Sequence, residues 1–256
     1  MKMKVIYSIS LMVAAVAVLA LSVAVHASTM DNRIESSAMK SYVFKTYLKG
    51  DDINIKSKDG VVALTGTVSE ESHKSLAQET VASLPGVKSV DNRLEVKGEH
   101  PAEKSDSWIT TKVKTTLLFH RSVSAITEVD TKDGIVTLRG DALSQAQKDL
   151  TTEYAKDVEG VKDVRNEMTV SKTSKKTHRT SGEKIDDASI TAQVKMALLF
   201  HRSTSALNTK VETKHGVVTL SGKAGNAAEK DLVSKLVNDV NGVKSVKNQM
   251  TIEKSK

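Results

Sequence analysis

The chain has 256 residues, a formal net charge of +7 and no cysteine. The absence of cysteine excludes disulfides, thiolate catalysis and cysteine-based metal sites. Aromatic residues make up only 3% of the chain and proline occurs twice, so we expect several small aliphatic cores rather than one large aromatic core.

The first 27 residues have the pattern of a secretory signal peptide. Lys2 and Lys4 precede an apolar run over residues 9–25, which ends in the small-x-small tripeptide Val25-His26-Ala27. We expect cleavage after Ala27 and export to the periplasm. Retention as a membrane anchor is the alternative, because about 17 apolar residues just suffice to span a bilayer. Without Lys2 and Lys4 the net charge is +5, and in an exported protein this basic excess favours anionic envelope partners over nucleic acid.

Three glycines recur at the same spacing in three copies, which identifies an internal repeat. In each copy a short apolar strand lies between two glycines, and a third glycine follows 20 residues after the second. The repeats predict three small domains over residues 30–98, 105–171 and 186–254. We expect all nine glycines to be structural: Gly60, Gly66 and Gly86; Gly134, Gly140 and Gly160; Gly216, Gly222 and Gly242.

Each copy begins with a predicted helix whose apolar residues recur every four positions. These positions are Ile34, Ala38 and Tyr42 in the first copy, Ile109, Val113 and Leu117 in the second, and Ile190, Val194 and Leu198 in the third. Asp186 and Asp187 lie ahead of the third of these helices, where they suit the capping of its free N–H groups.

Two strands, a second helix and a last strand follow in each copy. In the third copy we expect strands over residues 207–213 and 217–221, joined by a hairpin in which Gly216 has a positive φ. Gly242 directly follows the second helix and suits a left-handed C-cap, and the last strand carries apolar residues from Val243 to Ile252. The buried stripe of the second helix is predicted at Ala228, Leu232, Leu236 and Val240, with Val233 and Val237 beside it, and its counterparts are Ala146, Leu150, Tyr154 and Val158.

The repeat unit is therefore α-β-β-α-β. If the last strand pairs with the second, the sheet has three strands and is mixed, and both helices cover one of its faces. We predict an α+β protein of three tandem two-layer domains after the signal peptide. Residues 172–185, between the second and third domains, form a polar and basic linker that contains Lys175 and Lys176.

These residues resemble the BON domain, a family with the pattern Gly-Val-Val-x-Leu-x-Gly, then a helix, then Gly-Val-x-x-Val-x-Asn. The last part of that pattern stands here at residues 86–92, 160–166 and 242–248. The whole chain is similar to osmotically inducible periplasmic proteins of the OsmY type, although it has three copies in place of the usual pair. The resemblance implies a non-catalytic module that associates with phospholipid or other envelope components.

The residues show no constellation typical of catalysis. The serines lie in polar turns without Gly-x-Ser-x-Gly, and no histidine pairs with an acid at a suggestive spacing. Paired carboxylates such as Glu70-Glu71 lie at predicted helix starts, where they complement the helix dipole. His120 and His201 have no second ligand at helical spacing. We therefore expect a protein that is not an enzyme and that has no cofactor and no metal.

The sharpest candidates for a binding site are Phe119-His120-Arg121 and Phe200-His201-Arg202, at the ends of two first helices. At 100° per residue Phe119 lies far from the apolar stripe of its helix, so an intact helix leaves it partly exposed or packed on a neighbouring repeat. An exposed ring beside an arginine suits an anionic lipid headgroup. The alternatives are that the helix ends earlier and Phe119 closes the core, and that the His-Arg pair neutralises the helix C-terminus.

The first repeat lacks the His-Arg pair, and its candidates for contact with an anionic surface are Lys45 and Tyr47. Lys175 and Lys176 of the linker are further candidates. We expect a periplasmic stress or envelope-maintenance protein that binds anionic phospholipid or other envelope components, periplasmic or outer-membrane proteins included, and no nucleic acid. The alternative is a chaperone-like protein that holds unfolded or transiting polypeptides.

Overall fold

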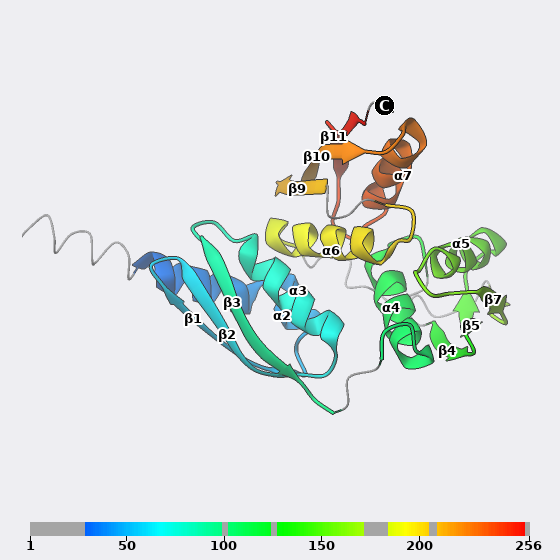
Figure 1. Ribbon diagram of the computed structural model, residues 1–256, viewed down its shortest axis with the longest axis horizontal. Helices are drawn as coiled ribbons and strands as arrows, with labels where there is room; N and C mark the ends of the chain where they lie inside the picture. Colours follow the sequence, from blue (N-terminus) through cyan, green and yellow to red (C-terminus); the bar gives the residue numbers. More distant parts are fainter. Residues whose placement is uncertain (1–28, 99–101, 124–126, 172–183, 205–208, 254–256) are drawn as a thin grey trace, which may run out of the picture.

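The computed structural model describes residues 29–98, 102–123, 127–171, 184–204 and 209–253. The predicted signal peptide with its cleavage site lies outside these residues, and so do Lys175 and Lys176. Three α-β-β-α-β units follow one another along the chain, each a small sheet with helices packed on one face (Figure 1). Within the described part of the chain, no helix is long and apolar enough to cross a membrane.

The first domain confirms the predicted mixed sheet. It consists of a helix over residues 29–40, α2 (Tyr42–Thr46), β1 (Asp52–Lys58), β2 (Val61–Val68), α3 (Glu71–Ala82) and β3 (Ser89–Val96). β2 is the central strand, because β1 pairs with it antiparallel and β3 pairs with it in parallel.

The second and third domains repeat this order, with the last strand in two pieces. The second consists of α4 (Asp106–Phe119), β4 (Glu128–Lys132), β5 (Ile135–Arg139), β6 (Asp141–Ala142), α5 (Gln145–Lys156), β7 (Asp163–Asn166) and β8 (Thr169–Val170). The third consists of α6 (Asp187–Phe200), β9 (Thr209–Lys214), β10 (Val217–Ala224), α7 (Ala227–Asn238), β11 (Ser245–Asn248) and β12 (Thr251–Ile252). The central strand again pairs antiparallel with the strand before it and parallel with the last strand of its domain.

An aspartate at the start of each first helix fixes the hairpin turn of its own domain. Asp187 accepts hydrogen bonds from the backbone N–H groups of His215 (2.7 Å) and Gly216 (2.8 Å). Both turn residues have a positive φ, 53° and 79°, as a tight two-residue hairpin turn requires, so the expectation for Gly216 is confirmed. Asp31 and Asp106 hold the other two turns in the same way.

The asparagine at the end of the motif ties the last strand to the second helix. In the third domain Asn248 Nδ2 donates to the carbonyl of Lys230 (2.9 Å) and to Oγ of Ser234 (2.8 Å). Its Oδ1 accepts the N–H of Met250 (3.0 Å). The asparagines at the same place in the other two domains make equivalent bonds.

The beginning of the first domain departs from the predicted helical stripe. The helix breaks at Ser41, whose backbone is extended and whose Oγ accepts the N–H of Phe44 at the start of α2. The new helix turns Val43 and Phe44 into the core and leaves Tyr42 only half-buried. The core position predicted for Tyr42 is wrong, because the predicted stripe assumes one continuous helix, whereas a second helix with its own N-cap begins at Tyr42.

The second helices are rotated relative to the predicted stripe. In α7 the residues fully buried in the domain's own core are Val233, Val237 and, just beyond the helix, Val240, whereas Ala228 is exposed. Leu236 belongs instead to the core of the second domain. The predicted stripe is therefore wrong at Ala228 and right at Val240, and Leu236 serves a contact between domains.

The third glycine of each repeat has the expected left-handed backbone but is not the helix cap. The C-caps of α3, α5 and α7 are Ser83, Asp157 and Asp239, all in the right-handed helical conformation. Each glycine comes three residues later, with φ between 85° and 91°. Two of these C-cap residues, Asp157 and Asp239, contact the neighbouring domain.

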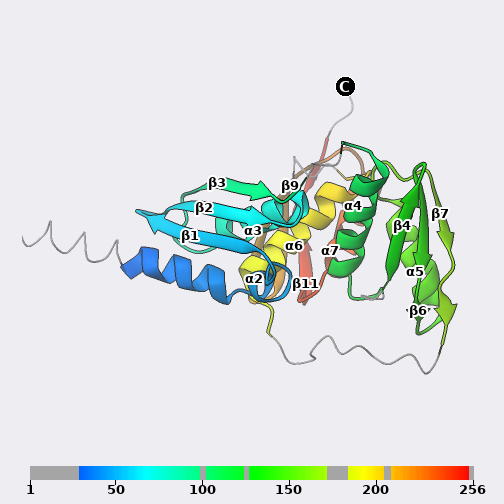
Figure 2. The same cartoon turned by 90° about the horizontal axis from the view of Figure 1, so that it is seen from below.

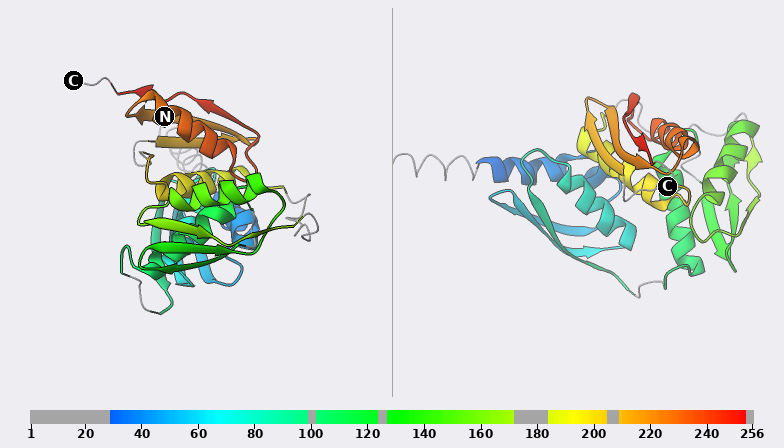
Figure 3. Two further views of the ribbon diagram at one scale, coloured as in Figure 1. Left: turned by 90° about the vertical axis from the view of Figure 1, so that its right-hand side faces the viewer. Right: turned by 45° about the horizontal axis from the view of Figure 1, so that its top comes forward.

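Helix α6 joins the three domains into one body. Ile190, Val194 and Leu198 lie in the core of the third domain, whereas Ala192 and Met196 lie in the core cluster of the first. Figures 1 and 3 show α6 between the third domain's sheet and the helices of the first domain, and Figure 2 shows α4 near its end. Eleven of its 14 residues are buried, which a helix of an isolated two-layer domain would not require.

Candidate functional site

The start of α6 supplies acceptors to the short helix α2 of the first domain. The N–H of Tyr42 donates to Oδ2 of Asp186 (2.8 Å), and the N–H of Val43 donates to Oγ of Ser189 (3.1 Å). These N–H groups belong to the first turn of a helix, where no intrahelical acceptor exists. The third domain thus adds to the capping of α2 that Ser41 begins.

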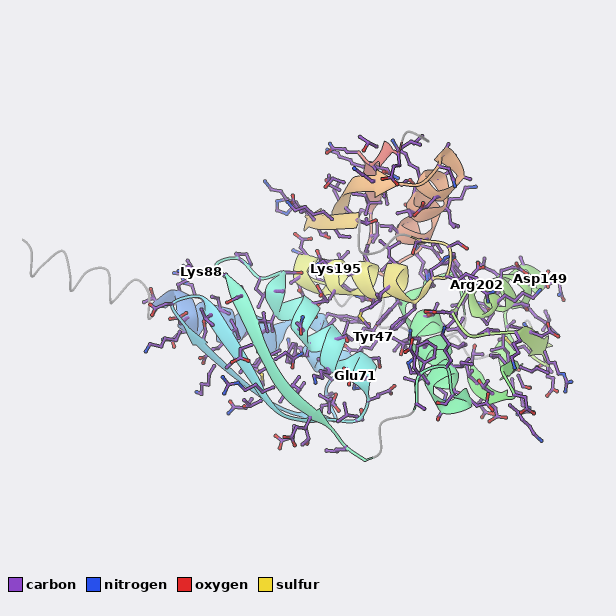
Figure 4. The ribbon with its side chains drawn as sticks, in the orientation of Figure 1. Tyr47, Glu71, Lys88, Asp149, Lys195 and Arg202 are labelled. Atoms are coloured by element: carbon purple, nitrogen blue, oxygen red, sulfur yellow. The ribbon has the colours of Figure 1, made fainter. Side chains whose placement is uncertain are left out.

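The predicted site residues Tyr47, Phe119 and Phe200 meet between domains (Figure 4 labels Tyr47). The ring of Phe119 is fully buried and lies edge-on to Tyr47, with 5.5 Å between centroids. The hydroxyl of Tyr47 donates to Oε1 of Gln193 (3.3 Å), and Phe200 is 4% exposed in the same cluster. α4 continues to Phe119, so the prediction that Phe119 packs on a neighbouring repeat is correct. The prediction that either phenylalanine is exposed to a lipid headgroup is wrong.

The two His-Arg segments hold the second and third domains together. The N–H of Arg121 donates to the carbonyl of Asp239 (3.0 Å), and the N–H of Asn241 donates back to the carbonyl of Phe119 (2.9 Å). The Arg121 guanidinium donates to the carbonyl of Asn238, the last residue of α7. A cation at this place satisfies carbonyls that a helix leaves free at its C-terminus and complements the helix dipole.

The same contacts also run in the opposite direction. The N–H of Arg202 donates to the carbonyl of Asp157 (2.8 Å), and the N–H of Glu159 donates to the carbonyl of Phe200 (3.4 Å). The Arg202 guanidinium donates to the carbonyl of Val158 (3.1 Å), and Figure 4 shows Arg202 where the two domains meet. Each domain gives its His-Arg segment and receives the other's, so the joint has approximate twofold symmetry. We call it the latch: residues 119–122 with 239–243, and residues 200–203 with 157–161.

The two histidines are buried in the latch, each beside an aspartate of the other domain. Nδ1 of His120 lies 3.5 Å from Oδ2 of Asp239, and its ring stacks on Tyr154 with 3.9 Å between centroids. Nε2 of His201 lies 3.3 Å from Oδ2 of Asp157. The His-Arg pair does lie at a helix C-terminus, as one alternative predicted, but at the second helix of the other domain.

Burial governs the ionisation of the latch. It lowers the pKa of His201 more than the charge of Asp157 raises it, and it raises the pKa of Tyr154, with the hydrogen bond to Asp239 adding to the rise. Burial also acts to raise the pKa of Asp239, but the neighbouring His120 and the hydrogen bonds from the hydroxyls of Ser122 and Tyr154 outweigh it and hold this pKa below its usual range. At neutral pH the latch therefore contains a charged Asp239 and an uncharged His201.

The comparison with known families decides which protein class this is. The model of the BON domain matches residues 30–98, 105–172 and 186–254, which together make up most of the chain. The chain belongs to the BON domain family. The resemblance drawn from the glycine and asparagine motifs is confirmed.

Proteins from several bacteria resemble this chain over about half of its length. Osmotically-inducible protein Y of Escherichia coli (strain K12) is 38% identical over 146 residues, 57% of this chain and 71% of the relative. Outer membrane lipoprotein DolP of Haemophilus influenzae is 30% identical over 139 residues, 53% of this chain and 70% of the relative. A 21 kDa hemolysin of Actinobacillus pleuropneumoniae is 36% identical over 116 residues, 44% of this chain and 59% of the relative.

Among solved structures, CdsD, a structural protein of the type III secretion system of Chlamydia trachomatis, matches with a TM-score of 0.26 and 17% identity. The match covers 87% of this chain and 91% of that chain. A similarity this low supports no conclusion about how the three BON domains are arranged.

A Ser-His-Asp set comes together in the first BON domain, which sequence spacing did not reveal. Nδ1 of His73 lies 2.6 Å from Oδ2 of Asp51 and 3.0 Å from Oγ of Ser69. In a catalytic triad the serine and the aspartate bind opposite ring nitrogens, whereas here both contact Nδ1. The set is therefore not arranged to activate the serine. Within the described residues no group of three or more His, Asp or Glu side chains could hold a metal ion.

A cleft of about 510 Å³ lies where the first two BON domains approach each other. Its lining includes Trp108, Glu71 (labelled in Figure 4) and Lys112, whose ammonium lies 3.6 Å from the centre of the Trp108 ring. Carboxylates, ammonium groups and aromatic rings all contribute, so the lining does not specify one class of ligand. Lys45 is exposed at the end of α2 and belongs to neither the cleft nor the latch.

Each BON domain leaves the outer face of its sheet uncovered, and the strand register assigns alternate residues to that face. In the third domain these include Lys210, Lys214, Lys223 and Lys247 against Glu212, and Glu253, directly after β12, pairs with Lys223 at 4.0 Å. In the first they include Lys56, Lys58 and Arg93 against Asp52, Asp91 and Glu95. In the second they include Lys132, Arg139 and Arg165 against Glu128, Asp130, Asp141 and Asp163. Of these three faces, the third is the basic one.

Proposed function

We propose that the chain is a non-catalytic envelope protein whose third BON domain binds anionic phospholipid through its open sheet face. The observation that carries the proposal is the set of four lysines on that face, against two glutamates, Glu212 and Glu253. The names of two relatives, an osmotically-inducible protein and an outer membrane lipoprotein, support a role in the envelope during osmotic stress.

The open face of the third domain suits a flat anionic surface. The ammonium of Lys210 lies 2.7 Å from a carboxylate oxygen of Glu212, and that of Lys223 lies 4.0 Å from a carboxylate oxygen of Glu253. Both pairs are close to neutral, so Lys214 and Lys247 provide the net positive charge. Each basic residue near an anionic membrane contributes about 1 kcal/mol, which gives roughly 2 kcal/mol for the two net charges. Such binding is reversible and salt-dependent rather than a permanent anchor.

The distribution of charge along the chain favours the same orientation. Residues 186–254 contain ten Lys and Arg against seven Asp and Glu, whereas residues 105–171 contain nine against eleven. A protein with this asymmetry turns its basic domain toward an anionic surface. The third domain would therefore approach the membrane with its open sheet, because its helical face is buried against the other two domains.

Sedimentation with vesicles containing phosphatidylglycerol tests the proposal. The chain should bind these vesicles at low salt, release them at high salt, and ignore vesicles of phosphatidylcholine alone. Replacing Lys214, Lys223 and Lys247 with serine should weaken binding by about 100-fold, from roughly 1 kcal/mol per lysine. The matched control replaces Lys56, Lys58 and Arg93 with serine on the balanced face of the first domain and should bind as the unchanged chain does.

A chain that ignores anionic vesicles at low salt, or a third-domain variant that binds like the control, would contradict the proposal. The chaperone-like alternative predicts instead a salt-insensitive suppression of the aggregation of an unfolded protein, unchanged by the lysine substitutions. Large exposed apolar side chains, such as Met39, Val170 and Leu199, occur in all three domains and do not by themselves favour that activity.

A further inference from the structure

His201 is held in the latch in a way that fixes where its proton lies. Its Nδ1 is 3.1 Å from the backbone nitrogen of Ser203, and because a backbone N–H can only donate, Nδ1 must accept. The proton of the uncharged ring is therefore on Nε2. That nitrogen is buried, lies 3.3 Å from Oδ2 of Asp157 and makes no well-aligned hydrogen bond.

Protonation of His201 conflicts with this arrangement. The added proton must go to Nδ1, where it would face the N–H of Ser203, and two donors repel each other. The lost bond belongs to the turn that presents Arg202 to the end of α5. The guanidinium of Arg202 is held at the end of α5 by two hydrogen bonds of 3.1 Å, to the carbonyls of Val158 and Val161.

Asp157 favours a positive charge on His201, but burial, His120 and Arg202 together oppose it more strongly. Asp157 faces His201 from the end of α5 with a side chain 42% exposed to solvent, while His120 and Arg202 both act against its protonation. On the other side of the latch, the carboxylate of Asp239 already accepts a hydrogen bond from Tyr154 (2.8 Å). Burial adds to the effect, since it lowers the pKa of His201.

We propose that the latch is an acid-sensitive joint, in which protonation of His201 releases Arg202 from the end of α5 and separates the second and third BON domains at this half of the interface. The closed joint binds fewer protons than the open one at His201. Its stability is therefore complete above about pH 6.5, the ordinary pKa of a histidine, and falls as the pH drops below that value. The opening equilibrium rises by at most about tenfold per pH unit.

Hydrogen exchange of the full-length chain at pH 7.5 and pH 5.0, corrected for the intrinsic effect of pH, tests this directly. The amides of Arg202 and Glu159, which donate across the latch, should lose about tenfold or more of their protection at pH 5.0, while the strands keep theirs. In His201→Asn the side-chain oxygen can still accept from Ser203 but cannot take up a proton, so protection should not change with pH. His73→Asn, in the first domain, is the matched control and should behave as the unchanged chain does.

Equal protection of the Arg202 amide at both pH values overturns the proposal, and so does an unchanged acid effect in His201→Asn. If that variant folds poorly, nitrogen NMR of the imidazole in the unchanged chain decides. His201 should carry its proton on Nε2 at pH 7.5 and become protonated in step with the loss of Arg202 protection. Protonation that leaves the Arg202 amide protected would show that the ring does not control the joint.

Discussion

Arg121 and Arg202 show how a side chain that is partly exposed can still be committed to a contact. The Arg121 side chain is 44% exposed, yet its guanidinium donates to backbone carbonyls of another domain. Because these carbonyls lie at the end of a helix, the bonds are charge-assisted and complement the helix dipole. From the sequence alone, by contrast, the same arginines are expected to be exposed and to bind lipid headgroups.

Replacing Arg202 with alanine should weaken the latch without unfolding a domain. The change removes two hydrogen bonds to backbone carbonyls, and with allowance for partial exposure we expect a loss of about 1–2 kcal/mol. Urea unfolding followed by circular dichroism measures this loss. Arg165→Ala, on the open sheet face of the second domain, is the control and should change stability by less than about 0.5 kcal/mol; equal effects would show that the latch bonds are not made in solution.

At the scale of secondary structure, each repeat is fixed by a few polar groups placed in the same way three times. The helix-start aspartate holds the hairpin turn, and the motif asparagine ties the last strand to the second helix. In the first repeat the second glycine, Gly66, lies where the central strand passes its neighbour closely. A Cβ on Gly66 would overlap the backbone oxygen of Asp52, and its φ of 114° disfavours any L side chain.

Gly66→Ala should therefore destabilise the first domain by roughly 2–4 kcal/mol, the sum of backbone strain and a clash that only the strand can relieve. Gly50→Ala is the control, because no atom lies within 4 Å of a Cβ at that position, and we expect less than about 0.5 kcal/mol. Thermal unfolding of the two variants compares them. Similar midpoints would mean that β1 and β2 are not paired as described.

The order of elements, the mixed sheet and the turn glycines could be predicted from the sequence, because each follows from a local period or a local backbone requirement. The errors occur where a second contact competes with the local pattern. Ala228 lies on a predicted stripe of α7, but the helix is rotated so that Leu236 enters another domain. His73 and Asp51 are 22 residues apart. The segments that pair in the latch are about 120 residues apart in one half and about 40 in the other. Helical spacing therefore reveals neither the Ser-His-Asp set nor the latch.

For the whole molecule, α6 and the latch determine whether three BON domains act as beads or as one body. α6 is buried between the first and third domains, with Lys195 paired to Glu79 of α3 at 2.7 Å. The latch then joins the third domain to the second through bonds that run in both directions. A rigid body presents the basic sheet face of the third domain in one fixed direction, which separate beads on flexible linkers would not do.

Distances between spin labels in the full-length chain test this claim most directly, since a chain without cysteine can be labelled at two chosen positions. Suitable exposed sites are Lys88 in the first domain and Asp149 in the second, both labelled in Figure 4, and Lys247 in the third. At pH 7.5 each pair should give one narrow distance distribution, and replacing Arg121 and Arg202 with alanine should broaden the Asp149–Lys247 distribution while the Lys88–Lys247 distribution stays narrow. Broad distributions for all three pairs in the unchanged chain would contradict the single body.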